Sequence, residues 1–432
     1  MSEREPIGVV GVGWVGLVTA ACFAELGHTV VARDIVPEKV EALGRGEVTI
    51  HEPGLAEVLE RNRERLTFTT EMAPVLEAAR LLFVCVDTPP TYSGDADLSR
   101  VRSVVSELGG GGDHVLVMKS TVPAGTGASI QRELPGVDYV SCPEFLKEGS
   151  AVADFLEPDR VVIGQDGQDR GAADAVAVLY EPLGAEIIHT DVASAEMIKL
   201  ASNAFLATKI SFINEIANVS EEVGADVDEV ARGMGLDERI GPAFLRAGIG
   251  YGGSCFPKDV SALKMLAGNS GYHFQLLTAV VEVNELQKRR VVGKLEKHLG
   301  SLAGKKIALL GLAFKANTDD MREASSLVLA ARLQGAGAEV SAYDPVAEES
   351  AGELLQSVRM APQALDALEG ADAAVLVTEW PEFAELDWKE AAARMENPIL
   401  IDGRNYLDPE PLRRAGFVYE GIGRSSQAPS GL

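Results

Sequence analysis

The chain has 432 residues, of which 46% are hydrophobic and 24% charged, and its formal net charge at pH 7 is −26. This length exceeds one ordinary core, so we expect a globular protein of two or three domains. The acidic balance excludes a broad basic surface for nucleic acid, but a local cluster of Lys and Arg would still hold an anionic small ligand.

The apolar runs and the cysteines of the chain exclude further classes of protein. We expect no signal peptide, because the charged residues 3–5 lead directly into the first apolar run, and no apolar run is long enough to span a membrane. The four cysteines have neither C-x-x-C spacing nor a metal-binding pattern; they are Cys22, Cys85, Cys142 and Cys255. We therefore predict a protein of the reducing cytoplasm, without a metal.

The first predicted strand, residues 7–10, runs into the turn Gly11-Val12-Gly13-Trp14-Val15-Gly16. A helix is predicted over 17–26, and a second strand over 29–32 leads to Asp34. A G-x-G-x-x-G turn between a strand and a helix, followed by an acid after the next strand, is typical of a dinucleotide site.

Each glycine of this turn has a physical role. Gly11 permits the tight turn, Gly13 lets backbone N–H groups reach a pyrophosphate, and Gly16 allows close helix packing. Asp34 is expected to hydrogen-bond the adenosine ribose and so to favour NAD over NADP, whereas the neighbouring Arg33 weakens that preference. A glycine turn without a ligand is the alternative.

Further apolar runs alternate with helical stretches and predict a parallel doubly wound sheet. The runs are 7–10, 29–32, 66–69, 81–86, 115–118 and 138–140, with 160–164 and 185–189 as extensions. Loops 86–90 and 119–121 follow the fourth and fifth strands. Because ligands bind beyond the carboxyl ends of such strands, both loops are expected to line the cofactor crevice.

A long helix is predicted over residues 191–223, where apolar residues recur with helical period and also lie off the main stripe. It is expected to be buried on more than one side, to connect two domains and to supply a subunit interface. Lys199 and Asn203 stand four residues apart and share a face of this helix. They would stabilise negative charge on an oxygen; a solvated helix face is the alternative.

The stretch Gly252-Gly253-Ser254-Cys255-Phe256-Pro257-Lys258-Asp259 places one cysteine after a flexible glycine pair. Pro257 suits the first turn of a helix, so Cys255 is predicted to stand just before a helix N-terminus and near a lysine. Both features favour the thiolate, which is the attacking form of cysteine. A buried structural cysteine is the alternative.

Residues 305–315 restart the strand and glycine-turn pattern; a helix over 325–334 and strands over 339–343, 373–377 and 399–401 follow. This second turn lacks G-x-G-x-x-G spacing, so we expect a ligand other than a dinucleotide. The predicted fold is α/β, with two Rossmann-like doubly wound parallel-sheet domains joined by a long central helix and a helical domain. The expected bounds are 1–190 for the NAD-binding domain, 191–300 for the central helical domain, and 301–432 for the C-terminal domain.

From about Ile7 to Tyr406 the chain resembles the UDP-glucose/GDP-mannose dehydrogenase family. Besides the N-terminal turn, the resemblance rests on residues 119–123 (KSTVP), 143–149 (PEFLKEG), Lys199 with Asn203, 252–259 (GGSCFPKD), 311–315 (GLAFK) and 402–405 (DGRN). The sequence after Cys255 is most similar to the UDP-glucose branch.

The resemblance implies oxidation of a sugar C6 alcohol to a carboxylate with two NAD+ and one water, on a UDP-sugar substrate. The presence of Cys255 agrees with this chemistry, because a thiolate adds to an aldehyde and gives a thiohemiacetal and then a thioester. Asp259 is the expected base, through a water that Thr121 also holds, and Glu148 is expected to assist hydrolysis of the thioester. For both acids a surface role is the alternative.

The resemblance also assigns binding positions and a homodimer through the central helix. NAD-contacting positions are Gly11, Val12, Gly13, Gly16, Asp34, Lys39, Thr88, Thr121, Glu148, Lys258 and Arg322. Substrate positions are Glu144, Phe145, Leu146, Lys147, Glu148, Lys199, Asn203, Phe244, Leu245, Arg246, Ala247, Gly248, Gly252, Lys315 and Arg404, with Arg239 supplied across the dimer interface. These lysines and arginines would form a basic pocket for an anionic nucleotide sugar.

Three alternatives remain open at this point. GDP-mannose or another UDP-hexose is the alternative substrate within the family. A single-step NAD-dependent hydroxyacid dehydrogenase shares the nucleotide fold but would have no use for Cys255. A non-catalytic NAD-sensing module is the third.

Overall fold

The computed structural model describes residues 4–109 and 113–424. The chain forms two compact units, the first made of Met1–Ser202 with Ser261–Tyr272, and the second of Asn203–Val260 with His273–Leu432. The division passes through two helices, α9 (Val192–Val223) and α11 (Phe256–Asn269). Within the described residues, no helix is both long and apolar enough to cross a membrane.

The first unit contains an eight-stranded sheet of order β3-β2-β1-β4-β5-β6-β7-β8. Its strands are β1 (Ile7–Val10), β2 (Val30–Arg33), β3 (Leu66–Thr69), β4 (Leu81–Val84), β5 (Val115–Met118), β6 (Asp138–Ser141), β7 (Arg160–Gly164) and β8 (Glu186–Thr190). The strands β1 to β6 are parallel, as predicted.

The last two strands differ from the prediction in direction. They extend the sheet as expected and are parallel to each other, but β7 is antiparallel to β6. The connection between β6 and β7 contains one short helix, α7 (Ala151–Leu156). A neighbouring antiparallel strand needs no full crossover helix, so this short connection is sufficient.

Two hydrophobic clusters cover this sheet, because successive side chains of a strand point to opposite faces. Ile7 and Val9 belong to one cluster, with Phe23 and Phe83, whereas Val10 belongs to the other. A sheet buried on both faces explains why its central strands are continuous apolar runs. The other helices of this unit are α1 (Trp14–Glu25), α2 (Pro37–Arg45), α3 (Leu55–Arg61), η1 (Arg63–Arg65), α4 (Ala73–Ala78), α5 (Ser99–Leu108), α6 (Thr126–Glu133), α8 (Gly171–Tyr180) and η2 (Glu181–Leu183).

The second unit contains a six-stranded parallel sheet of order β11-β10-β9-β12-β13-β14. Its strands are β9 (Lys306–Leu310), β10 (Glu339–Tyr343), β11 (Arg359–Met360), β12 (Ala373–Leu376), β13 (Ile399–Asp402) and β14 (Val418–Glu420). Two apolar clusters again cover the two faces. The predicted pair of Rossmann-like sheets is therefore confirmed.

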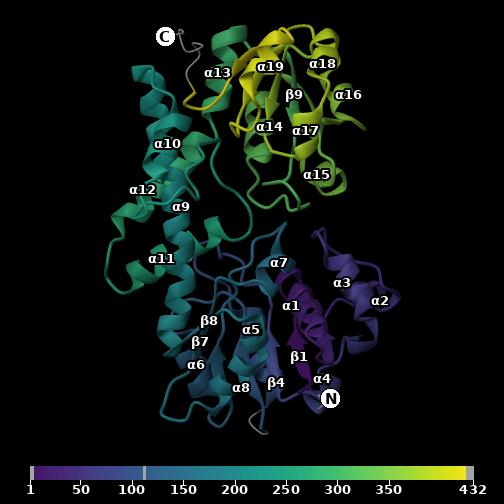
Figure 1. Cartoon of the computed structure of the whole chain (residues 1–432), viewed down its shortest axis with the longest axis vertical. Helices are drawn as coiled ribbons and strands as arrows, with labels where there is room; N and C mark the ends of the chain where they lie inside the picture. Colours follow the sequence, from purple (N-terminus) through teal and green to yellow (C-terminus); the bar gives the residue numbers. More distant parts are fainter. Residues whose placement is uncertain (1–3, 110–112, 425–432) are drawn as a thin grey trace. The chain divides into compact units, whose positions relative to one another are not determined.

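Helices surround this second sheet, as Figure 1 shows for α14, α16, α17 and α18. The helices of the unit, besides α9 and α11, are α10 (Val227–Gly235), α12 (Gln275–Gln287), α13 (Arg290–Leu299), α14 (Ser325–Gly335), α15 (Glu348–Leu354), α16 (Ala364–Leu368), α17 (Pro381–Glu385), α18 (Trp388–Arg394) and α19 (Pro409–Arg414).

Helix α9 forms over the predicted range, but in this single chain its apolar residues are not all buried. Ala207, Ile213 and Ala217 are fully buried, whereas Phe205 and Phe212 are 65% and 48% exposed. The main apolar stripe therefore faces the core, and the aromatic residues off that stripe form an uncovered apolar face.

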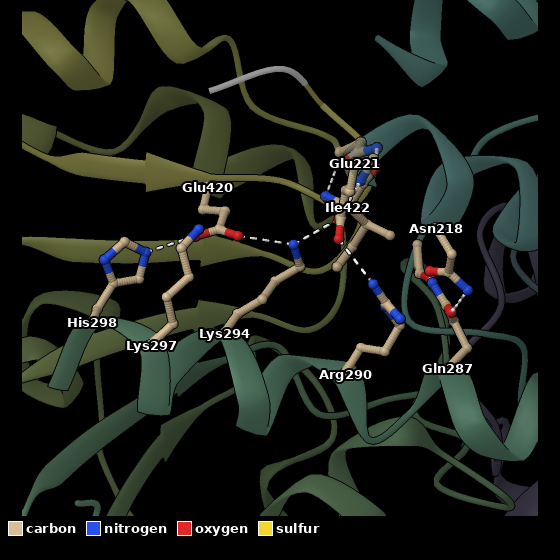
Figure 2. A network of polar contacts seen from close by, with 12 residues as sticks. Asn218, Glu221, Gln287, Arg290, Lys294, Lys297, His298, Glu420 and Ile422 are labelled. Carbon is tan, nitrogen blue, oxygen red and sulfur yellow. Dashed lines mark hydrogen bonds and ion pairs between the residues drawn. The ribbon is translucent and has the colours of Figure 1, made fainter. Parts of the chain in front are cut away.

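A network of ion pairs connects α13 to the end of α9 and to β14 (Figure 2). Lys294 contacts both Glu221 (2.6 Å) and Glu420 (2.9 Å), and Arg290 contacts Glu221 at 2.9 Å. A cavity of about 630 Å³ lies beside the network. Each of the four cations that line it is paired with a carboxylate, and these ion pairs connect the last strand to the helices.

Candidate functional site

The first glycine turn of the N-terminal unit has the geometry of a dinucleotide cradle. A Cβ added at Gly16 would lie 1.8 Å from the Gly11 carbonyl oxygen, so only glycine fits there. Asp34 follows β2, and its Oδ2 accepts a hydrogen bond from the Val12 N–H at 2.8 Å. A turn that excludes side chains, with a carboxylate beyond the second strand, fits a pyrophosphate and a ribose.

Two cations near Asp34 are already paired with carboxylates. Lys39 Nζ lies 3.3 Å from Asp34 Oδ2. Arg33, which weakened the expectation of NAD over NADP, instead contacts Glu107 at 3.0 Å and donates to the Thr70 carbonyl. Because Arg33 is engaged by Glu107, it is not available for a 2′-phosphate, and the preference for NAD stands.

Two side-chain hydrogen bonds join the loops after β4 and β5: Thr88 Oγ1 donates to the Thr121 carbonyl at 2.8 Å, and Ser120 Oγ donates to the Val86 carbonyl at 2.6 Å. Glu148 is buried, with 7% of its surface exposed, so the surface alternative for this acid is wrong. Lys258 and Arg322 belong to the second unit, where Arg322 is paired with Asp320 at 2.8 Å.

Residues 143–151 comprise most of the loop between β6 and α7 and the first residue of α7, and they contain the predicted sugar-contacting positions 144–148. Glu144 Oε1 lies 2.8 Å from Lys199 Nζ, and its Oε2 accepts from the Leu146 N–H at 2.6 Å. Lys199 is 3% exposed, so the solvated-face alternative is wrong for it. The guanidinium of Arg160 lies 3.8 Å from the centre of the Phe145 ring, a cation–π contact.

The rest of this loop is held by two further carboxylates. Asp154 accepts from the Lys147 N–H at 2.8 Å and lies 3.0 Å from Lys147 Nζ. Glu52 accepts from the N–H groups of Gly149 (2.7 Å) and Ala151 (2.8 Å). The sequence analysis missed Glu52, although the stretch His51-Glu52-Pro53-Gly54 is a recognisable turn signal.

In the second unit, Cys255 stands directly before α11, and its carbonyl accepts from the Asp259 N–H at 2.8 Å. Pro257 lies in the first turn of that helix, as predicted. Of the four cysteines only Cys255 is partly exposed, whereas Cys22, Cys85 and Cys142 are buried. Burial raises the pKa of the Cys22 and Cys85 thiols to about 12, which leaves Cys255 as the accessible candidate nucleophile.

Asp259, the candidate base, is held by two donors. Asn203 Nδ2 donates to its Oδ2 at 2.6 Å, and Lys258 Nζ donates to its Oδ1 at 2.6 Å. Asp259 is 1% exposed and Asn203 is 7% exposed, so neither lies on a solvated surface. One carboxylate thus contacts α9 and the first turn of α11, which begins beside the cysteine.

The loop that precedes Cys255 is fixed by buried amides. The Asn214 Oδ1 accepts from the Gly248 N–H, Gln287 donates to the Gly248 carbonyl, and Asn284 exchanges two hydrogen bonds with the Tyr251 backbone. A Cβ at Gly252 would lie 2.2 Å from the Glu323 carbonyl oxygen. Sequence reasoning missed these amides; two of them, Asn284 and Gln287, stand three residues apart on α12 and so share a face of that helix.

The other predicted sugar positions lie around this loop. Arg404 donates to the carbonyls of Gly250 (2.9 Å), Phe314 (2.9 Å) and Val377 (2.7 Å), so it joins three backbone segments. Lys315 lies over the Phe314 ring. Of the remaining positions, Leu245, Ala247 and Gly248 are buried, Arg246 is exposed, Phe244 has a positive φ of 64°, and Arg239, 88% exposed, pairs with Asp237.

The contacts of Asp344 favour a ligand other than a dinucleotide at the second glycine turn. This aspartate follows β10 as Asp34 follows β2, but its Oδ2 accepts from the N–H groups of Leu312 and Ala313 and from the Trp380 indole. Its Oδ1 accepts from the Val346 and Ala347 N–H groups. A carboxylate that is 3% exposed and accepts five hydrogen bonds is not available to a ribose.

Comparison with known proteins identifies the family of this chain. Residues 5–184 match the NAD binding domain of the UDP-glucose/GDP-mannose dehydrogenase family, 193–286 its central domain and 308–409 its UDP binding domain. UDP-glucose 6-dehydrogenase TuaD of Bacillus subtilis (strain 168) is 46% identical over 97% of this chain and 93% of its own length. A UDP-glucose 6-dehydrogenase of Rhizobium meliloti (strain 1021) is 44% identical over 97% of this chain and 99% of its own.

A solved UDP-glucose dehydrogenase from the archaeon Pyrobaculum islandicum has the same fold. It is 37% identical, aligns with a TM-score of 0.90, and covers 98% of this chain and 99% of its own. The first unit therefore binds NAD, and the chain is an NAD-dependent oxidoreductase. The protein is a nucleotide-sugar dehydrogenase that belongs to the UDP-glucose/GDP-mannose dehydrogenase family.

Proposed function

We propose that this protein oxidises UDP-glucose at C6 to UDP-glucuronate, through a thiohemiacetal and a thioester on Cys255. The observation that carries the proposal is the position of Cys255, which is the one partly exposed cysteine and stands at the N-terminus of a 14-residue helix. A helix N-terminus favours negative charge, as an attacking thiolate requires.

The reaction follows from the functional groups of the chain. NAD, when bound, supplies the acceptor for each of the two hydrides that leave the sugar C6. Asp259 takes the hydroxyl proton in the first oxidation, which leaves an aldehyde, and the Cys255 sulfur then adds to the aldehyde carbon. After the second hydride has left, water cleaves the resulting thioester and releases the thiolate. One alcohol, two NAD+ and one water give one carboxylate, two NADH and three protons.

The remaining catalytic assignments rest on charge and burial. Lys199 and Asn203 lie one turn apart on α9, and we assign them to the oxygen that gains negative charge. Thr121 and Glu148 are assigned to the water that hydrolyses the thioester. A buried lysine and a buried amide make effective donors, because the low dielectric around them strengthens each hydrogen bond.

Substrate binding is assigned to the second glycine turn and to the two loops described above. Lys315 and Arg404 are proposed to meet the diphosphate, and loops 144–148 and 244–252 to surround the sugar. The match to the family's UDP binding domain over residues 308–409 supports this assignment. The names of two relatives that are 46% and 44% identical to this chain support UDP-glucose over GDP-mannose or another UDP-hexose as the substrate.

Stoichiometry tests the proposal. The wild-type protein should form two NADH for each UDP-glucose, and Cys255→Ser should form no UDP-glucuronate while it still binds NAD+ and UDP-glucose. One NADH per sugar would indicate a single-step dehydrogenase instead. Normal formation of the acid by Cys255→Ser would overturn the covalent mechanism. The same assay with GDP-mannose and other UDP-hexoses identifies the preferred substrate.

We further propose a homodimer through α9. Phe205, Phe212, Val219 and Val223 lie along one exposed side of this helix and are 48–71% exposed. A second copy of this chain would bury the stripe, because a two-fold axis brings the same face of both α9 helices together. Arg239, nearby and exposed, is assigned to the partner's site. We also propose domain boundaries at residues 190 and 300. A location in the reducing cytoplasm is a further proposal.

A further inference from the structure

Three separate segments of the N-terminal unit meet at one buried carboxylate. Glu52 is 6% exposed and lies in the loop before α3. Its Oε2 accepts from the Trp14 indole N–H at 3.0 Å and from the Gly149 N–H at 2.7 Å, and its Oε1 accepts from the Ala151 N–H at 2.8 Å.

The partners of Glu52 belong to two binding elements. Trp14 is part of the glycine turn Gly11–Gly16 and begins α1, whose first N–H groups would bind the pyrophosphate of the dinucleotide. Gly149 and Ala151 directly follow Glu148, at the end of the loop assigned to the sugar. A shift of the turn that moves the indole of Trp14 therefore acts on the same carboxylate that fixes the end of that loop.

From this geometry we infer that Glu52 is a positioning residue that couples dinucleotide binding at the turn to the order of loop 143–151. The inference rests on the proposed function for the identity of the sugar, but not for the coupling itself. Asp154 and Glu144 also hold the loop, yet both act from within it or from α7. Of the three carboxylates Glu52, Asp154 and Glu144, Glu52 is the one whose hydrogen bonds also reach the glycine turn.

Two variants distinguish the hydrogen bond between Glu52 and Trp14 from those that Glu52 accepts from Gly149 and Ala151. Glu52→Ala removes all three acceptor contacts. Trp14→Phe keeps an aromatic ring but removes the indole N–H. It therefore removes only the hydrogen bond between Glu52 and the glycine turn, and the N–H groups of Gly149 and Ala151 still donate to Glu52. Trp380→Phe is the matched control, because it removes an equivalent indole bond, to Asp344 at 3.0 Å, in the other unit.

Hydrogen exchange of the peptide that spans 143–151 measures the coupling without any turnover. In the wild type and in Trp380→Phe, saturating NAD+ should slow exchange of this peptide by about fivefold or more, a factor typical of coupled sites. In Glu52→Ala and Trp14→Phe the slowing should fall below about twofold while NAD+ still binds. No slowing in the wild type, or full slowing in Trp14→Phe, would overturn the inference.

Kinetics provide the second readout. In Trp14→Phe the KM for UDP-glucose should rise, because the sugar loop is no longer ordered by NAD+, whereas kcat should change less. If the wild type does not oxidise UDP-glucose, the proposed substrate is wrong, but the exchange experiment still decides the role of Glu52. If exchange is coupled and the KM for UDP-glucose does not move, loop order is irrelevant to sugar binding, and that part of the inference is wrong.

Discussion

Lys199 Nζ lies 2.8 Å from Glu144 Oε1, and the two side chains are only 4% and 5% exposed. A pair this buried joins α9 to the loop before α7. It also fixes the lysine that we assign to the sugar oxygen, so stability and activity are coupled at this contact.

Glu144→Gln should therefore destabilise the protein by about 3–5 kcal/mol, because it leaves a buried ammonium without its counter-charge. Urea unfolding measures the loss. In the double variant Glu144→Gln/Lys199→Met the loss should be smaller than the sum of the two single losses, since the ammonium that lost Glu144 as its ion-pair partner has been removed as well. Strictly additive losses would show that the pair is not coupled.

Asp34→Ala should raise the KM for NAD+ by about tenfold, which corresponds to the loss of one hydrogen bond to the ribose. Because Arg33 is held by Glu107, the variant should gain only weak activity with NADP+. Initial rates with both cofactors check this. Unchanged NAD+ kinetics would contradict the ribose role of Asp34.

The network in Figure 2 predicts a loss of stability in acid. Burial opposes the charged form of Glu221, but hydrogen bonds from Lys294 and the Gly423 N–H outweigh it and lower the pKa of this carboxyl. Burial likewise opposes ionisation of Glu420, and the contacts with Lys294, Lys297 and His298 lower its pKa.

A carboxyl whose pKa is lower in the folded state binds fewer protons there than in the unfolded chain. The contribution of the network is therefore present above the ordinary carboxyl pKa of 4.5 and is lost as the pH falls through the folded values. Urea unfolding from pH 7 to pH 3 should show a steeper loss for the wild type than for Glu221→Gln/Glu420→Gln. Parallel curves would mean that the network does not contribute.

Phe212→Glu should dissociate the proposed dimer, because it places a charge in the apolar stripe of α9. Sedimentation velocity should then show a monomer. Val178→Glu is the control, since Val178 is a similarly exposed apolar residue (57%) on α8 and its replacement should leave the assembly intact. A wild-type protein that sediments as a monomer would contradict the proposed interface.

Much of the fold could be predicted from the sequence, because its signals are local. The apolar runs of β1 and β9 and the glycine turns that follow them determine where these strands end and where the next helices begin. The direction of β7 could not be predicted, since an alternation of strands and helices does not report which way a strand runs after a short connection.

The sequence by itself located the candidate residues: the glycine turn, Asp34, and Cys255 before α11 follow from steric and capping rules that act within a few residues. Only the tertiary structure decided what holds them in place. Glu52 reaches Gly149 across 97 residues of sequence, and Asn284 reaches the Tyr251 backbone across 33. Such contacts depend on how distant segments pack, and a buried polar side chain finds its partner only once the fold has brought the two together.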